Sequence, residues 1–231
     1  MMSKRETRGI NVSSSFVSRF TFHISPSIKR GRHIFKKKHK RASDEQLMES
    51  IQQGDTIAFD ELYQRYSQRL LYYFHRMFGG NKEKAQDFLQ DLFLKIIEKP
   101  EQFISKHKFT SWIFTVAHNM CKNEYRRLDV RKIIENDISL DSVPSEFENG
   151  CHPIEQTIDQ NIFENQLLRE LTKMNPDYQT TFLLRFQENL TIKEISEILE
   201  CSEGTVKSRL FHTTRKLMNR LNEFNPNRVG T

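Results

Sequence analysis

Two helix-start signals follow each other closely near the C-terminal end of the chain, and this pattern constrains the fold more than any other. Thr191 and Glu194 in "TIKE" form a capping box, in which each residue satisfies a backbone N–H of the first helical turn. Ser202 suits the N-cap of a second helix, and Glu200 stands in the break between the two helices. The spacing therefore predicts a helix-turn-helix.

The second helix of this pair is expected to have one buried side and one cationic side. Val206, Leu210 and Leu217 recur at helical spacing. A cationic outward side suits the major groove of DNA, where cations meet phosphates and donors reach base edges. The alternative is a solvated helix of an αα-hairpin, but an exposed aromatic favours contact with a partner. The outward positions are Glu203, Lys207, Ser208, Phe211 and Arg215, with Arg209 at their border.

Composition favours an all-α protein without a membrane span. The chain has 231 residues with 8 Gly and 6 Pro, which leaves room for long helices in two modest domains. No apolar run approaches the roughly 18 to 20 residues of a spanning helix. The three cysteines, Cys121, Cys151 and Cys201, show no metal-binding spacing and suggest no disulfide framework. A cytoplasmic location without membrane insertion is expected.

The positive charge of the chain is concentrated at its start. Residues 1–42 contain 12 of the 36 Lys and Arg but only one of the 30 Asp and Glu, so residues 43–231 carry a net charge of −5. The segment lacks a helical apolar period, and we expect a disordered basic extension. It reads equally as a DNA-contacting arm or as an extension without function; a transit peptide and a misassigned start are further alternatives.

Residues 43–127 predict a bundle of four helices. Ser43 is the expected N-cap of the first helix and Gly54 its stop. The second helix ends at Gly79-Gly80, the third is bounded by Pro100, and the fourth closes the domain near Arg127.

The fourth helix and the loop before it have the composition of a nucleic-acid surface. Basic and aromatic residues alternate in the loop 103–109, which suits single-stranded DNA with unstacked bases. For Phe109 and Trp112 a place in the core is the alternative, and for Trp112 the preferred one. Polar and basic side chains gather on one side of the helix opposite a broad apolar face. The candidate residues are Lys106, Lys108, Phe109, Thr115, Asn119, Lys122, Asn123 and Arg126.

The third helix has a polar stripe that suits a protein partner, although a solvated face is the simpler interpretation. The stripe contains Asp87, Gln90 and Asp91. Residues 128–161 form an acidic linker, expected to be a flexible tether. The second domain then runs over 162–224, where Asn175 and Pro176 mark a helix start and Asn189 a left-handed helix end.

The stretches "AQDFLQDLFLKI", "FTSWIFTVAHNMCKNEYRR" and "LTIKEISEILECSEGTVKSRLF" resemble the extracytoplasmic-function (ECF) group of sigma-70 family RNA polymerase sigma factors. The resemblance spans 43–127 and about 162–222. It implies two small helical domains joined by a flexible linker: sigma-2, which binds core polymerase and the minus-10 element, and a helix-turn-helix sigma-4, which binds the minus-35 element. Glu200 departs from the family, in which a turn glycine is usual.

The resemblance also implies a role for each group of residues. Asp87, Gln90 and Asp91 would contact core polymerase, and the loop 103–109 with Asn119, Lys122 and Asn123 would form the minus-10 surface. Lys207, Ser208, Arg209 and Phe211 match the minus-35 helix. The partners would be core polymerase and promoter DNA, and an anti-sigma factor held between the two domains is compatible with the family pattern.

Two other function classes fit parts of the sequence. A helix-turn-helix transcriptional regulator would account for the C-terminal half but leaves the first half unexplained. A nucleic-acid enzyme lacks a phosphate-binding loop or a convincing metal motif, although Asp87 and Asp91 could chelate a cation at i, i+4. The expected function is therefore binding without catalysis. No catalytic residue, metal, cofactor or small-molecule substrate is expected.

Overall fold

The computed structural model describes residues 39–136 and 158–222, and within them the chain is helical and has no strand. Expectations for 1–38 and for the middle of the acidic linker, 137–157, lie outside the described residues. The all-α class is confirmed.

An N-terminal bundle contains α3 (Asp44–Gln52), α4 (Thr56–Met77), α5 (Lys82–Glu98), the short 3₁₀ helix η2 (Pro100–Gln102) and α6 (Phe109–Asn136). A C-terminal bundle contains α7 (Ile158–Thr172), α8 (Pro176–Phe186), α9 (Ile192–Ile198) and α10 (Glu203–Arg220).

Local side-chain chemistry sets the helix starts. The Ser43 side chain accepts from the Gln46 N–H at 3.2 Å, and Gln46 bonds back to the Ser43 N–H, which completes a capping box. Asn175 caps α8 ahead of Pro176 as expected. These caps give α3 and α8 fixed starting points.

Two residues in the left-handed backbone conformation lie in the C-terminal bundle, one between α8 and α9 and one between α9 and α10. Asn189 has φ 55°, which confirms the left-handed conformation expected after α8. Glu200 has φ 49° in the turn between α9 and α10, at the position where the family usually has a glycine. A non-glycine residue in this region costs about 1 kcal/mol, which the packed helices on both sides must offset.

The structure differs from the expected boundaries in two places. Residues 39–42 were expected in the disordered extension, yet His39 is buried with its Nε2 2.9 Å from Asp55 Oδ2. Arg65 of α4 donates to the carbonyl oxygens of His39 and Ala42, which holds this segment against the bundle. In addition, α6 continues beyond Arg127 to Asn136, so the first residues of the expected linker are helical.

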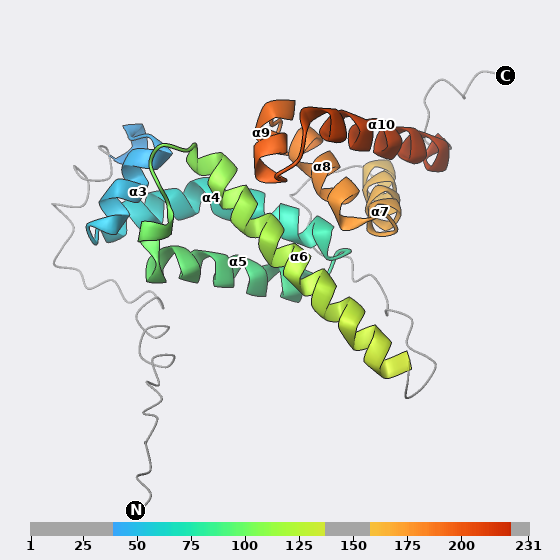
Figure 1. Ribbon diagram of the computed structural model, residues 1–231, viewed down its shortest axis with the longest axis horizontal. Helices are drawn as coiled ribbons and strands as arrows, with labels where there is room; N and C mark the ends of the chain where they lie inside the picture. Colours follow the sequence, from blue (N-terminus) through green and yellow to red (C-terminus); the bar gives the residue numbers. More distant parts are fainter. Residues whose placement is uncertain (1–38, 137–157, 223–231) are drawn as a thin grey trace, which may run out of the picture.

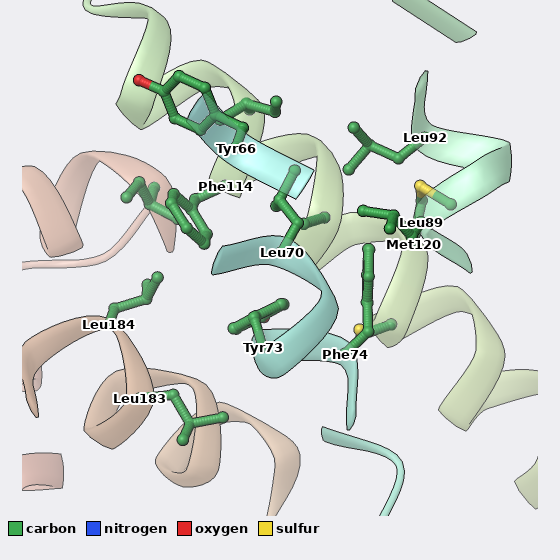
Figure 2. Packing of buried hydrophobic residues seen from close by; sticks show 14 of the residues in the cluster. Tyr66, Leu70, Tyr73, Phe74, Leu89, Leu92, Phe114, Met120, Leu183 and Leu184 are labelled. Carbon is green, nitrogen blue, oxygen red and sulfur yellow. The ribbon is translucent and has the colours of Figure 1, made fainter. Parts of the chain in front are cut away.

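The two bundles share one hydrophobic core. Figure 1 shows α8 and α9 beside α4 and α6, and contacts link α4 to α7 and α8 and α6 to α8 and α9. In the close view of Figure 2, Leu183 and Leu184 of α8 approach Tyr73 of α4 and Phe114 of α6. All four side chains are 0–1% exposed. The sequence indicated two domains but gave no sign of this contact.

Candidate nucleic-acid and polymerase interfaces

The outward side of α10 is formed as the helical periodicity predicted. Ser202 caps the helix by accepting from the Thr205 N–H at 3.1 Å, and Val206 and Leu217 turn inward with 0% and 5% exposure. Phe211 is 59% exposed, an unusual position for a large aromatic side chain. The other residues predicted on the outward side of α10 are also exposed: Glu203, Lys207, Ser208 and Arg215.

Arg209 lies apart from this exposed set. Its Nη2 is 2.6 Å from Asp177 Oδ2 at the start of α8, and only 18% of its side chain is exposed. The guanidinium also lies 6.0 Å from the centroid of the Tyr178 ring. Arg209 therefore ties α10 to α8, and a contact with DNA would compete with this ion pair.

The predicted nucleic-acid side of α6 is also exposed. Asn119, Lys122, Asn123 and Arg126 all face outward, whereas the apolar positions Ile113, Ala117 and Cys121 are fully buried. Thr115 is half-buried, and its hydroxyl donates to the Ser111 carbonyl at 2.9 Å, an ordinary intrahelical bond. Four of the five candidates from Thr115 onwards are thus accessible to a partner.

The loop before α6 separates its charged residues from its aromatic ones. Lys106 and Lys108 are exposed, but Phe109 is fully buried and packs edge to face on Tyr66 with ring centroids 5.1 Å apart. Phe103 lies against it at 5.5 Å. The expectation that Phe109 meets a base is therefore corrected: its ring anchors the loop to the core, which is the alternative considered for it.

Lys108 forms an ion pair that the sequence did not indicate. Its Nζ is 2.8 Å from Glu194 Oε1, the capping-box carboxylate of α9. The hydrogen bonds from Lys108 and Thr191 lower the pKa of Glu194 to about 2. A residue of the predicted minus-10 loop thus contacts the first helix of the helix-turn-helix directly.

The polar stripe of α5 faces outward. Asp87, Gln90 and Asp91 are exposed, and Leu89 and Leu92 on the other side of the helix are buried. Two apolar side chains stand near this stripe, Leu94 with 41% exposure and Tyr63 of α4 with 43%. The ring of Tyr63 packs on that of Phe93 in α5, with centroids 4.7 Å apart. Exposed aromatic side chains are enriched at protein–protein interfaces, so this surface suits a protein partner.

The described residues contain no candidate metal centre. Among residues 39–136 and 158–222 no group of three or more His, Cys, Asp and Glu is placed to hold a metal ion. In the same part of the chain, no helix has the length and apolar character that a membrane crossing requires. No third His, Cys, Asp or Glu of the described residues joins Asp87 and Asp91 in a group that could hold a metal ion. The alternative that these two residues chelate a cation is therefore not supported.

The described residues thus form a helix-turn-helix unit packed on a second helical bundle, and each unit has an exposed polar helix face. Two family models match the same two units. Sigma-70 region 2 matches residues 62–131 and Sigma-70, region 4 matches residues 164–217, together more than half of the chain. The chain belongs to the sigma-70 family of RNA polymerase sigma factors, in its ECF group.

Relatives and solved structures agree with this assignment. The chain is 29% identical over 174 residues to the RNA polymerase sigma-H factor of Pseudomonas aeruginosa, covering 73% of this chain and 88% of the relative. It is 27% identical over 188 residues to the ECF RNA polymerase sigma-E factor of Escherichia coli K12, covering 79% and 96%.

Two solved structures share the fold. The sigma factor RpoE of Bartonella quintana, solved in complex with the anti-sigma factor NepR, matches with a TM-score of 0.58 and 19% identity, covering 71% of this chain and 96% of that one. CnrH, solved in complex with the cytosolic domain of CnrY, matches with a TM-score of 0.58 and 18% identity, covering 79% and 99%.

Proposed function

We propose that this sigma factor directs core RNA polymerase to promoters with two separate elements and helps to open the DNA, without catalysing a reaction itself. The N-terminal bundle would bind core polymerase and the minus-10 element, and the C-terminal bundle would bind the minus-35 element. Both partners act in the cytoplasm. The observation that carries the proposal is the pair of outward polar helix faces, on α6 and α10, in the two units that match sigma-70 regions 2 and 4.

Each face has residues suited to its proposed partner. On α10, Lys207 and Arg215 can meet phosphates, while Ser208 and Phe211 can approach base edges and a thymine methyl group. On α6, Asn119 and Asn123 supply amide donors and acceptors, and Lys122 and Arg126 supply charge. On α5, Asp87, Gln90 and Asp91 suit a basic or polar surface of core polymerase.

The regulator alternative is not favoured, because the N-terminal half matches region 2 rather than a ligand-sensing domain. An anti-sigma factor is a further proposed partner. One similar solved structure is the sigma factor RpoE in complex with the anti-sigma factor NepR, and another is CnrH in complex with the cytosolic domain of CnrY.

Run-off transcription from a promoter library tests the proposal. Sigma-free core polymerase would be supplied with and without this protein, and the templates that yield transcripts would be sequenced. We expect protein-dependent initiation at templates that share two spaced motifs. No added initiation, together with tight duplex binding by the protein alone, would instead identify a regulator.

A further inference from the structure

Arg65 of α4 holds the end of the basic N-terminal extension by its backbone. Its Nη2 donates to the carbonyl oxygens of His39 and Lys40 at 3.1 and 3.2 Å. Its Nη1 donates to the carbonyl oxygen of Ala42 at 3.0 Å. One guanidinium thus binds three carbonyl groups within four residues, which fixes the path of the chain there.

A buried side chain strengthens this attachment. The His39 side chain is only 8% exposed, and its Nε2 lies 2.9 Å from Asp55 Oδ2. Asp55 is itself held in place, because its Oδ1 accepts from the N–H groups of Ile57 and Ala58 as the N-cap of α4. We call residues 39–42 the anchor, since both backbone and side chain bind it to the bundle.

The anchor lies beside the start of α6. Asp44, two residues after it, accepts from the hydroxyl of Tyr66, whose oxygen is 2.7 Å from Thr110 Oγ1 in the first turn of α6. Glu45 Oε1 accepts from the Phe109 N–H at 2.9 Å. Contacts link α3 to η2 and α6, and Figure 1 shows α3 next to the loop that enters α6. The basic extension therefore joins the bundle next to the proposed minus-10 loop.

The segment that ends in the anchor is strongly cationic. Residues 29–41 contain eight Lys and Arg and no Asp or Glu. Lys40 and Arg41 are exposed, and Asp44, the next acid in the sequence, is already paired with Arg65 at 2.7 Å. Duplex DNA carries one negative charge per about 1.7 Å of its axis, so its backbone is a partner of matching charge.

The length of this segment limits where it can bind. Ten residues, 29–38, precede the anchor, and they span at most about 33–36 Å when extended. Phosphates of one strand follow each other at about 3.4 Å along the axis, so this length covers about ten of them. A segment that starts beside the minus-10 loop can therefore contact only DNA close to the minus-10 element.

We propose, on the basis of the sigma-factor function proposed above, that residues 29–41 form a DNA-binding arm that contacts phosphates next to the minus-10 element. The anchor fixes where the arm begins and so raises its local concentration at this DNA. Phosphate contacts carry no base information. The arm therefore adds salt-dependent affinity, while the choice of sequence stays with α6 and α10.

Salt titration of promoter binding by the full-length protein with core polymerase tests the arm. The promoter is one recovered by run-off transcription. The arm variant loses four charges near the anchor, through Lys36→Gln, Lys37→Gln, Lys38→Gln and Lys40→Gln. The control variant loses four charges far from the anchor in the same extension, through Lys4→Gln, Arg5→Gln, Arg8→Gln and Arg19→Gln.

Each lost phosphate contact lowers the slope of log affinity against log salt by about 0.9. We expect the arm variant to lower this slope by about two to four, and to bind at least about 10-fold more weakly near 0.15 M salt. The control variant should change the slope by less than about one, because a longer tether lowers the local concentration.

Three outcomes would overturn the arm. The slope of the arm variant could equal that of the unmodified protein, or both variants could lower it equally, which would remove the role of the anchor. A reduced affinity for core polymerase with an unchanged slope would assign the segment to a protein partner instead. Failure of the sigma-factor function is distinct, because the unmodified protein would then support no initiation.

Photo-cross-linking tests the position of the arm. With p-benzoylphenylalanine in place of Phe35, we expect cross-links to promoter DNA within about ten base pairs of the minus-10 element, the reach given above. His39→Ala keeps the charge of Lys and Arg in the arm but removes the buried side chain of the anchor, and should lower this yield at least 3-fold. Cross-links confined to the minus-35 element, or a yield unchanged by His39→Ala, would contradict the proposal.

Discussion

Tyr73 and Thr180 lie 107 positions apart in the sequence, yet their hydroxyl oxygens are 3.3 Å apart inside a core that both bundles build. The two halves of the chain therefore depend on each other for stability as well as for position.

Leu184→Ala is expected to destabilise the whole chain by about 2–5 kcal/mol, the usual cost of such a cavity in a core. Leu184 belongs to α8, whereas the single tryptophan, Trp112, reports on the N-terminal bundle. Urea unfolding followed by Trp112 fluorescence should therefore shift to lower denaturant. Met218→Ala, at an exposed position, should stay within about 0.5 kcal/mol. An unchanged Trp112 transition in Leu184→Ala would mean that the bundles unfold independently.

Lys207→Ala and Arg209→Ala should differ in their effects. Lys207 is exposed, so its loss should weaken promoter binding and reduce the slope of log affinity against log salt by about one, with unchanged stability. Loss of Arg209 also removes the partner of Asp177 and should cost about 1–2 kcal/mol of stability. Salt titration of promoter binding and urea unfolding separate the two effects. Equal stability of both variants would contradict the structural role of Arg209.

Asp91→Arg should weaken binding of core polymerase by about 10-fold or more, equivalent to about 1.4 kcal/mol, because it reverses a charge on the proposed contact surface. Competition binding with a labelled sigma factor measures this change. Glu49→Arg, an equal reversal at an exposed position of α3, is the matched control. If core affinity is the same for both variants, the α5 stripe is not part of the interface.

Asn119→Ala should impair promoter opening more than promoter binding, since an exposed amide on α6 can contact an unpaired base. Loss of one such contact corresponds to about 1–3 kcal/mol. Permanganate reactivity of unpaired thymines, compared with filter binding, distinguishes the two steps. Asp129→Ala, exposed further along the same helix, provides the comparison. Normal melting in Asn119→Ala would show that the minus-10 assignment is wrong.

Glu194 should contribute to a loss of stability in acid. Hydrogen bonds from Lys108 and Thr191 hold the pKa of Glu194 at about 2 in the folded chain, below its ordinary value of 4.5. The unfolded chain therefore binds this proton first, and the stabilisation present above about 4.5 is lost as pH falls towards about 2. Unfolding midpoints across this window should fall less steeply in Glu194→Gln. Identical slopes for the two proteins would contradict this origin.

Local features of the structure were predictable because their causes lie within a few residues. Ser43 and Asn175 cap their helices through neighbouring backbone N–H groups, and Asn189 takes the left-handed conformation expected of it. Exposure of Phe211 followed from helical periodicity alone. The family resemblance rested on the same short stretches.

The contact between α4 and α8 was not predictable, because each half of it resembles an ordinary solvated surface. Thr180 and Glu188 are polar residues on a short helix and just after it, and nothing nearby in sequence indicates that both are buried. Their partners, Tyr73 and Arg69, lie more than 100 positions away. Phe109 shows the same limit, since basic neighbours suggested nucleic acid while its packing partner Tyr66 is distant in sequence.

The shared core also changes how this sigma factor could diverge. Each loss of about 1.4 kcal/mol from the packing around Tyr73 lowers the ratio of folded to unfolded chains tenfold. Because Tyr73 packs with side chains of α8, the volume that one side of this core fills limits the volume left for the other. The two halves are therefore expected to change as one unit, even where their exposed helix faces serve different partners.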